Sequence, residues 1–372
     1  MKICILSMQR VLNYGSLLQA YSLKKMITSL GHEVSFIDIE PNEQDNLKRL
    51  EVKSFDEGLK LSGRNIVYRL LQQDTIIIYG LKKIIAKKNV VKLQKKFADN
   101  VLELNETNNE KKYDVCVIGS DEVFNCLNDE SWGFTSQLFG NVRQANKVIT
   151  YAASCGFTKP AELADGVKDI VSNSFALVST FSVRDENTAN FVREIAKIEP
   201  QYHLDPVAVG NFDDEIGKAS ECLNKLPQKY CIVYSYHGRM GASEKAAVLD
   251  ICRKEKMTPV SIGGSQKWVH THLELDPFEV LCVFKNAAYV VTDTFHGAIF
   301  SAKYASRYAI IVRDSNKNKL SDLISRLKID EHRVTSIEQI VDLYAVLDDK
   351  KTIRDIENVQ YERSIKYLEQ NI

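Results

Sequence analysis

The sequence predicts an α/β fold of two domains, each built on a parallel sheet. The chain has 372 residues, which exceeds the usual size of one compact domain. Short apolar runs alternate with amphipathic segments, as expected when parallel strands are joined by helices. The predicted strands end in polar or small residues, and ligands usually bind at the carboxyl edge of such a sheet.

The composition is that of a soluble globular protein, with 44% hydrophobic and 26% charged residues. Lys+Arg and Asp+Glu total 49 each, so no nucleic acid is expected as a partner. The eight cysteines include no C-x-x-C pair, which favours reduced, buried thiols. The first residues are typical of a strand rather than a signal peptide, and no run reaches the ~20 apolar residues of a membrane span. We therefore expect a cytoplasmic protein.

The first domain is expected to span residues 1–206. Its predicted strands are Lys2–Ser7, Glu33–Ile39, Tyr113–Ile118, Lys147–Ala153, Phe175–Val178, Phe181–Val183 and Tyr202–Leu204. A helix is expected from Leu17 to the residue before Gly31, and another from about Asn187 to Ile195. Residues from about 42 to 112 show few strand signals and predict a helical insertion. The first strand-to-helix turn lacks G-x-G-x-x-G, which disfavours a nicotinamide or flavin dehydrogenase.

Residues 207–228 are polar and are interpreted as a linker, followed by a second α/β domain at 229–335 and helices at 336–372. The predicted strands of this second domain are Tyr230–Tyr234, Thr258–Ile262, Tyr289–Thr292 and Tyr308–Val312. The predicted helices are Ser243–Lys254, Pro277–Asn286, the helix after His296, Ile337–Leu347 and Lys351–Leu368. Together these elements predict two Rossmann-like domains facing across a cleft, a GT-B-like architecture with a C-terminal helix.

The most informative stretch is Asn286–Ala302, which predicts a buried strand, a short polar turn and a helix. Thr292 or Thr294 can cap that helix and leave backbone N–H groups free for an anion. His296 stands at the helix start, and an imidazole titrates near neutral pH, so it is a candidate for proton transfer. The alternative is a histidine that only hydrogen-bonds a neighbouring loop.

Two further side chains are candidates for catalysis. Arg184 follows a strand and could clamp a carboxylate or phosphate, or form a buried ion pair with Asp185 or Glu186. Asp121 could act as a general base or merely cap the following helix. The candidate substrate-binding residues are Asn13, Tyr14, Gly15, Ser16, Gln19, Ser120, Ser154, His237, Gly263, Thr294 and Gly297.

No metal or cofactor is expected in the reaction. His270 and His272 have metal-like spacing, but no third ligand is near them in the sequence. The chain also lacks the D-x-D motif that metal-dependent sugar-nucleotide transferases use.

Six motifs resemble the polysaccharide pyruvyl transferase family and occur in the family's order over about residues 10 to 305. They are Asn13-Tyr14-Gly15-Ser16-Leu17-Leu18-Gln19-Ala20, Gly119-Ser120-Asp121, Tyr151-Ala152-Ala153-Ser154, Ser182-Val183-Arg184-Asp185, Leu204-Asp205-Pro206 and Phe295-His296-Gly297. Two positions depart from the family's pattern. Asp293-Thr294 stands where the family often has Asn-Ser, which adds a negative charge beside the expected anion site. Phe124 stands where the family often has Trp.

The resemblance implies a transferase that attaches the pyruvyl group of phosphoenolpyruvate to two hydroxyls of a sugar as a cyclic ketal, in cell-surface polysaccharide synthesis. His296 would then be the acid, Asp121 the base and Arg184 a donor ligand. The first domain, with its insertion, would face the acceptor. A nucleotide-sugar-dependent glycosyltransferase and a non-catalytic glycan-binding scaffold remain as alternatives, because one fold serves many functions.

One helix predicted at Ile76–Ala98 is strongly basic. Its lysines are Lys82, Lys83, Lys87, Lys88, Lys92, Lys95 and Lys96. Such a face could contact anionic headgroups or a lipid-diphosphate-linked acceptor at the inner surface of the cell membrane. The alternative is an ordinary solvated helix face.

Overall fold

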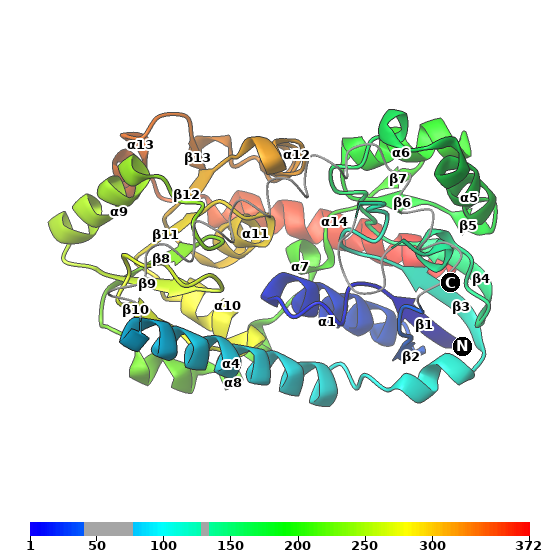
Figure 1. Cartoon of the computed structure of the whole chain (residues 1–372), viewed down its shortest axis with the longest axis horizontal. Coiled ribbons are helices and arrows are strands. Elements are labelled where there is room, and N and C mark those ends of the chain that lie inside the picture. Colours follow the sequence, from blue (N-terminus) through cyan, green and yellow to red (C-terminus); the bar gives the residue numbers. More distant parts are fainter. Residues whose placement is uncertain (41–76, 128–133) are drawn as a thin grey trace.

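The computed structural model describes residues 1–40, 77–127 and 134–372, and in 77–85 it describes the backbone alone. Two larger parallel sheets organise these residues (Figure 1). The first has the order β2-β1-β3-β4-β5, and the second β10-β9-β8-β11-β12-β13. The first sheet contains β1 (Lys2–Leu6), β2 (Glu33–Phe36), β3 (Tyr113–Ile118), β4 (Ala145–Thr150) and β5 (Val178–Thr180). The second contains β8 (Tyr230–Tyr234), β9 (Thr258–Ile262), β10 (Thr271–His272), β11 (Tyr289–Thr292), β12 (Tyr308–Ile311) and β13 (Arg333–Val334).

Strand order reverses once in each sheet, between β1 and β3 in the first and between β8 and β11 in the second. All of these neighbours pair in parallel. The central strands β8, β11 and β12 are buried along their whole length, which explains their continuous apolar sequences. The reversal point of an open α/β sheet is where ligands bind, so the loops after β1, β3, β8 and β11 are the places to look for a site.

The helices of the first half are α1 (Tyr14–Ser29), α4 (Ile77–Asn100), α5 (Asp165–Phe175) and α6 (Glu186–Ala196). Helix α1 begins three residues before the predicted Leu17, because the Asn13 side chain caps it. Helix α5 is absent from the sequence prediction. The predicted strand Phe175–Val178 is wrong, because Phe175 ends this helix and β5 begins at Val178.

The residues interpreted as a polar linker are largely helical and packed. They form α7 (Pro206–Val209), α8 (Asp213–Lys218) and the 3₁₀ helix η5 (Ser220–Lys225). Val207, Phe212 and Ile216 are buried in the same hydrophobic cluster as residues of both sheets. This segment therefore contributes to the core between the two halves.

The second half contains α9 (Ala242–Lys254), α10 (Pro277–Lys285), α11 (Phe295–Tyr304), α12 (Lys317–Leu327) and α13 (Gln339–Asp342). Helix α12 is not part of the sequence prediction, although its buried Leu320, Leu323, Ile324 and Leu327 have helical spacing. The remaining short elements are β6 (Ser182–Val183), β7 (Gln201–Tyr202), η2 (Glu106–Glu110), η3 (Ser136–Phe139), η4 (Pro160–Glu162), η6 (Asp314–Asn316), η7 (Asp330–His332) and η8 (Leu343–Ala345).

Two long helices connect the halves. Helix α14 (Lys350–Asn371) starts beside α11, where Lys350 Nζ donates to the Ala302 carbonyl at 2.5 Å. It then crosses to the first sheet (Figure 1), where the Tyr367 hydroxyl donates to the Thr150 carbonyl at 2.8 Å. On another face, Phe97 of α4 packs edge-on against Phe278 of α10, with ring centroids 4.9 Å apart.

All eight cysteines are buried free thiols. None of the described helices is both long and apolar enough to cross a membrane. On the basic helix α4, the described lysines Lys87, Lys88, Lys92, Lys95 and Lys96 are exposed, whereas the side chains of Lys82 and Lys83 lie outside the described residues.

Candidate active site

Asp205 is the centre of a buried group that draws side chains from both halves of the chain. It caps α7 by accepting a hydrogen bond from the Val207 amide through Oδ1 at 3.0 Å. Its Oδ2 is 3.0 Å from Arg184 Nη1, 3.2 Å from Ser120 Oγ and 3.6 Å from His296 Nε2. The carboxylate is fully buried. Arg184 and His296, the candidate catalytic residues of the two halves, therefore converge on a carboxylate of the protein.

The electrostatics of this group favour ionised Asp205. Burial opposes the charged form, but the neighbouring His296 and Arg184 outweigh it and lower the pKa of Asp205 to about 2. Burial also opposes the charge of Arg184, yet the carboxylates of Asp205 and Asp121 raise its pKa above the usual value. Asp205 and Arg184 are therefore a permanent ion pair at neutral pH.

Arg184 is more enclosed than a simple donor clamp. Its side chain is 3% exposed, and its guanidinium carbon lies 4.3 Å from the centroid of the Phe295 ring. The ion pair predicted as the alternative, with Asp185 or Glu186, is wrong. Asp185 caps α6 by accepting from the Thr188 amide, and Glu186 pairs with Arg193.

His296 lies in the first turn of α11, where the Thr294 hydroxyl caps the helix by accepting from the Gly297 amide at 3.0 Å. Its side chain is 15% exposed, so it is not sealed in the core. Its Nε2 faces Asp205, and the ring packs closely against Gly15 of α1. A Cβ added to Gly15 would lie 2.1 Å from Nδ1, which shows how closely the two elements approach. The N-terminal turns of α1 and α11 thus meet at this imidazole.

Asp121 belongs to the same group through a second chain of hydrogen bonds. Its Oδ2 accepts from Ser16 Oγ at 2.5 Å, and Ser16 Oγ accepts from Asn13 Nδ2 at 2.8 Å. Asp121 is 14% exposed, and its Oδ1 is 3.9 Å from Arg184 Nη1. Its φ of 76° lies in the left-handed region, which is costly for a residue with a Cβ and often marks a functional turn.

Gln19 and Ser120 support the site from behind and are fully buried. Gln19 Oε1 accepts from the Ser120 amide at 3.2 Å, and its Nε2 donates to Ser7 Oγ at 2.8 Å. These contacts hold the turn after β3 against α1. The two residues thus orient Asp121 and Asp205.

Five predicted binding residues have other surroundings. Tyr14 is buried and donates through its hydroxyl to the Leu275 carbonyl at 3.1 Å, which links the two halves. Ser154 is fully buried and donates to Asp185 at 2.8 Å. Gly297 packs against Thr292, whose Oγ1 would be 2.1 Å from an added Cβ.

His237 and Gly263 lie on exposed loops after β8 and β9, and among the described residues neither of them contacts Asp205. The ring nitrogen Nδ1 of His237 lies 2.6 Å from the Ser265 carbonyl oxygen. Gly263 has a φ of 76°, a conformation that favours glycine.

The sequence model of the polysaccharide pyruvyl transferase family matches residues 13–305, which is most of the chain and includes every member of the Asp205 group. The chain belongs to the polysaccharide pyruvyl transferase family. This membership makes the protein a transferase, and it confirms the resemblance found in the sequence. A comparison with curated protein sequences gives no significant match.

Solved structures similar to this family member include sugar-nucleotide enzymes. The Streptomyces sp. SF2575 glycosyltransferase SsfS6, complexed with thymidine diphosphate, is 10% identical, with a TM-score of 0.47 and coverage of 100% of this chain and 99% of that one. The Methanocaldococcus jannaschii UDP-GlcNAc 2-epimerase, in complex with UDP-GlcNAc and UDP, is 14% identical, with a TM-score of 0.45 and coverage of 97% and 100%.

At Asp293, where the chain departs from the family pattern, the added carboxylate pairs with Arg313, which a second carboxylate shares. The Asp293 side chain is fully buried, and its Oδ2 lies 3.0 Å from Arg313 Nε. Arg313 also contacts Glu244 at 2.6 Å, so it is held from both sides. The other departure, Phe124, is fully buried and stacks on Phe139 with ring centroids 5.6 Å apart.

The sequence analysis did not include Asp205, Phe295 or Lys319 among the site residues. Asp205 could have been found, because Asp-Pro directly after a strand predicts a helix cap at the carboxyl edge of the sheet. Lys319 of α12 pairs with Glu122, next to Asp121, at 2.7 Å and so joins the two halves beside the site. No signal in the sequence indicates that pair.

Proposed function

We propose that the protein transfers the pyruvyl group of phosphoenolpyruvate to two hydroxyls of a sugar, forming a cyclic ketal, in the synthesis of a cell-surface polysaccharide. One observation carries the proposal: the N-termini of α1 and α11 meet at His296, beside the buried Asp205–Arg184 pair. Helix N-termini attract anions through their free N–H groups and dipoles. Phosphoenolpyruvate carries two anionic groups.

The donor would lie against these two helix ends rather than directly on Arg184. Arg184 is nearly enclosed, and its charge is balanced by Asp205. We therefore assign Arg184 the role of holding Asp205 ionised and in place. Asp205 lies 3.6 Å from Nε2 on one side of the imidazole, and the donor would approach the exposed side of the ring.

The chemistry needs an acid and a base that exchange roles. His296 would give a proton to the vinyl carbon while the first sugar hydroxyl bonds to the adjacent carbon and passes its proton to Asp121. The second hydroxyl then displaces phosphate from that carbon. Its proton restores His296, and Asp121 returns its proton to the departing phosphate. Both side chains end as they began, and no metal or redox cofactor takes part.

The acceptor would be bound by the exposed side of the same loops. Asp121 and Asn13 offer hydrogen-bond groups for sugar hydroxyls. Tyr236, on the loop after β8, is 58% exposed and stacks on Arg239 at 4.7 Å, and an exposed aromatic ring suits the apolar face of a sugar. Burial is the main cause that raises the pKa of Tyr236; the charge of Asp121 adds to the rise and that of Lys319 opposes it, so this ring lies near the site.

A lipid-linked acceptor would place the enzyme at the cytoplasmic face of the membrane. The exposed lysines Lys87, Lys88, Lys92, Lys95 and Lys96 form a basic face for anionic headgroups or an acceptor diphosphate. Sedimentation with anionic vesicles, but not with neutral ones, is the expected result. Replacing Lys92, Lys95 and Lys96 by Gln should release the protein without changing its turnover of a soluble acceptor.

The test of the activity is phosphate release from phosphoenolpyruvate in the presence of candidate sugar acceptors. Release should depend on the acceptor and should vanish in His296→Asn. Thermal stabilisation by a sugar nucleotide and not by phosphoenolpyruvate would overturn the proposal in favour of a glycosyltransferase. Binding of glycans without turnover of any donor would favour the scaffold alternative.

A further inference from the structure

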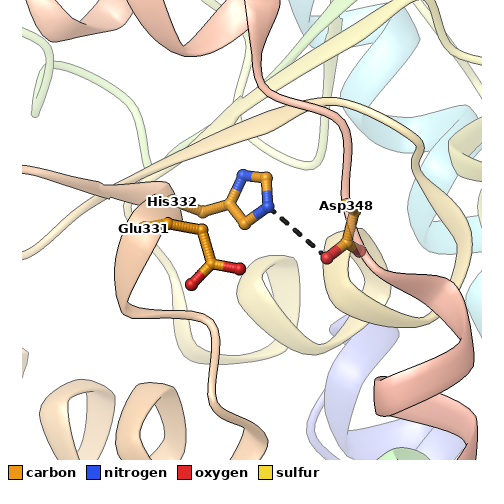
Figure 2. Close-up of side chains that lie close together, drawn as sticks. All are labelled: Glu331, His332 and Asp348. Atoms are coloured by element: carbon orange, nitrogen blue, oxygen red, sulfur yellow. Dashed lines mark ion pairs between the residues drawn. The ribbon is translucent and has the colours of Figure 1, made fainter.

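A second cluster of titratable side chains lies away from the loops of the Asp205 group, where β13 and α14 begin. It consists of Glu331, His332 and Asp348 (Figure 2). One ligand atom from each residue lies within 4.8 Å of the other two. Figure 2 shows the imidazole of His332 between the two acidic side chains.

The two inner members are buried and lack hydrogen-bond partners at the atoms that face each other. The side chains of His332 and Asp348 are 0% and 1% exposed, and His332 Nε2 is 3.4 Å from Asp348 Oδ1. Neither atom makes a hydrogen bond, although the buried Tyr308 hydroxyl, which also has no partner, lies near the Asp348 carboxylate. A buried polar atom without a partner is costly, so two of them pointing together require an explanation.

The other ring nitrogen fixes the proton. His332 Nδ1 is 3.0 Å from the Tyr308 carbonyl oxygen, which can only accept, so Nδ1 carries hydrogen. The neutral ring then presents a lone pair at Nε2 to a carboxylate oxygen. Two acceptors do not bind each other, but they can share a cation. A histidine that donates its second N–H to a backbone carbonyl is the usual form of a metal-bound histidine.

Neighbouring groups hold these ligand atoms in place. Asp348 Oδ2 accepts from Lys350 Nζ at 2.7 Å, which leaves Oδ1 aimed at His332. The Tyr308 ring stacks on the imidazole with centroids 3.8 Å apart and planes 17° apart. Glu331 is exposed and can swing its carboxylate onto a shared ion. Water would complete the coordination.

We propose that Glu331, His332 and Asp348 bind a divalent transition metal ion, with Zn²⁺ as the best match to one imidazole and two carboxylates. The ion would join the connection between β12 and β13 to the start of α14. It would serve the structure and not the transfer reaction. The competing explanation is that a proton fills the gap and makes a buried His332–Asp348 ion pair.

The first experiment is equilibrium dialysis of the full chain against Zn²⁺, with metal content measured by mass spectrometry. One Zn²⁺ per chain is expected, and Glu331→Gln should weaken binding by about tenfold or more. Glu331 is exposed, so this change should not unfold the protein. Its matched control is Asp330→Asn, the neighbouring exposed acid, which should bind as the wild type does. Absence of binding, or equal binding in Glu331→Gln, overturns the proposal.

The second experiment separates this cluster from the cysteines. Co²⁺ in place of Zn²⁺ should give a spectrum without thiolate charge-transfer bands. Zn²⁺ should raise Tm by a few degrees in the wild type and in Asp330→Asn, and less in Glu331→Gln. Lys350→Met should weaken Zn²⁺ binding about tenfold to a hundredfold by freeing the Asp348 carboxylate. Thiolate bands, or a Tm unaffected by Zn²⁺, would contradict the proposal.

Discussion

His296 and His332 each face an aspartate at a similar distance, but the surroundings of the two imidazoles differ. His296 Nε2 is 3.6 Å from Asp205, and His332 Nε2 is 3.4 Å from Asp348. His296 keeps 15% of its side chain exposed and packs its ring where the first turns of two helices meet. The side chain of His332 is fully buried, and its Nδ1 hydrogen-bonds to a backbone carbonyl.

The difference shows that the second nitrogen decides what a buried histidine–aspartate pair can do. An imidazole with one nitrogen available can exchange a proton with a ligand. An imidazole whose second nitrogen is hydrogen-bonded to the backbone can use only the nitrogen that faces the aspartate. It can bind a proton or a metal ion there, but it cannot exchange a proton with a substrate. The predictions below test this contrast.

The largest effect is expected from removing each imidazole in turn. His296→Asn should lower acceptor-dependent phosphate release about 10²- to 10⁴-fold, because a positioned acid is lost, with little change in Tm. His332→Gln should do the reverse, lowering Tm while kcat of the folded enzyme stays within a few-fold of wild type. Steady-state kinetics and thermal unfolding of both variants decide this. Equal losses of kcat in the two variants would contradict the proposed difference between the two histidines.

A smaller loss is expected when the His296 ring is displaced without being removed. In Gly15→Ala the new Cβ would meet Nδ1, so the ring must shift, and we expect about a 10²-fold loss of kcat from misplacement. Gly217→Ala is the matched control, because no atom lies within 4 Å of its added Cβ. Wild-type kcat in Gly15→Ala would show that the position of His296 is unimportant.

The ionisation of Asp205 should appear in the pH dependence of stability. Its pKa falls from 3.8 to about 2 on folding, which corresponds to about 2 kcal/mol of stabilisation. Because the folded pKa is the lower one, this contribution is present above about pH 4 and disappears as the pH falls through about 2. Urea unfolding between pH 5 and 2 should therefore show a shallower loss in Asp205→Asn than in the wild type. Parallel curves would contradict the assignment.

The smallest effect is expected from the ion pair that joins the halves near the surface. Lys319 and Glu122 are 25% and 29% exposed, in contrast with 3% and 0% for Arg184 and Asp205. Lys319→Met should cost at most about 1 kcal/mol, and the cost should shrink in high salt. Denaturant unfolding at two salt concentrations measures it. A cost that is large and independent of salt would show that this pair behaves like the buried one.

The sequence predicted the parts of this site that follow from local pattern. Polar residues at strand ends placed Asn13, Asp121, Arg184 and His296 at the correct edges, because strand alternation and sheet chirality constrain where those ends lie. It did not predict that Arg184 and His296 would meet at Asp205, a carboxylate of the protein itself. The ion pair considered as an alternative for Arg184 was with its neighbours in sequence, whereas its actual partner, Asp205, comes from a separate strand end that packs alongside.

Contacts between residues that are distant in the sequence could not be predicted, for a physical reason. Arg313, which follows β12, pairs with Asp293, and Lys319 reaches Glu122 from a helix that was not predicted. Such contacts depend on how finished elements pack, and no periodicity in the chain encodes them. The same holds for His332, whose partner Asp348 lies beyond another helix.

Helix α14 has a consequence for how the protein is made. Its Tyr367 packs against Tyr151 and His203 and bonds to Thr150, a residue synthesised 217 positions earlier. During translation, the surface of the first half that Tyr367 covers stays exposed until α14 has been synthesised. The first half is therefore the part that a nascent-chain chaperone would shield longest.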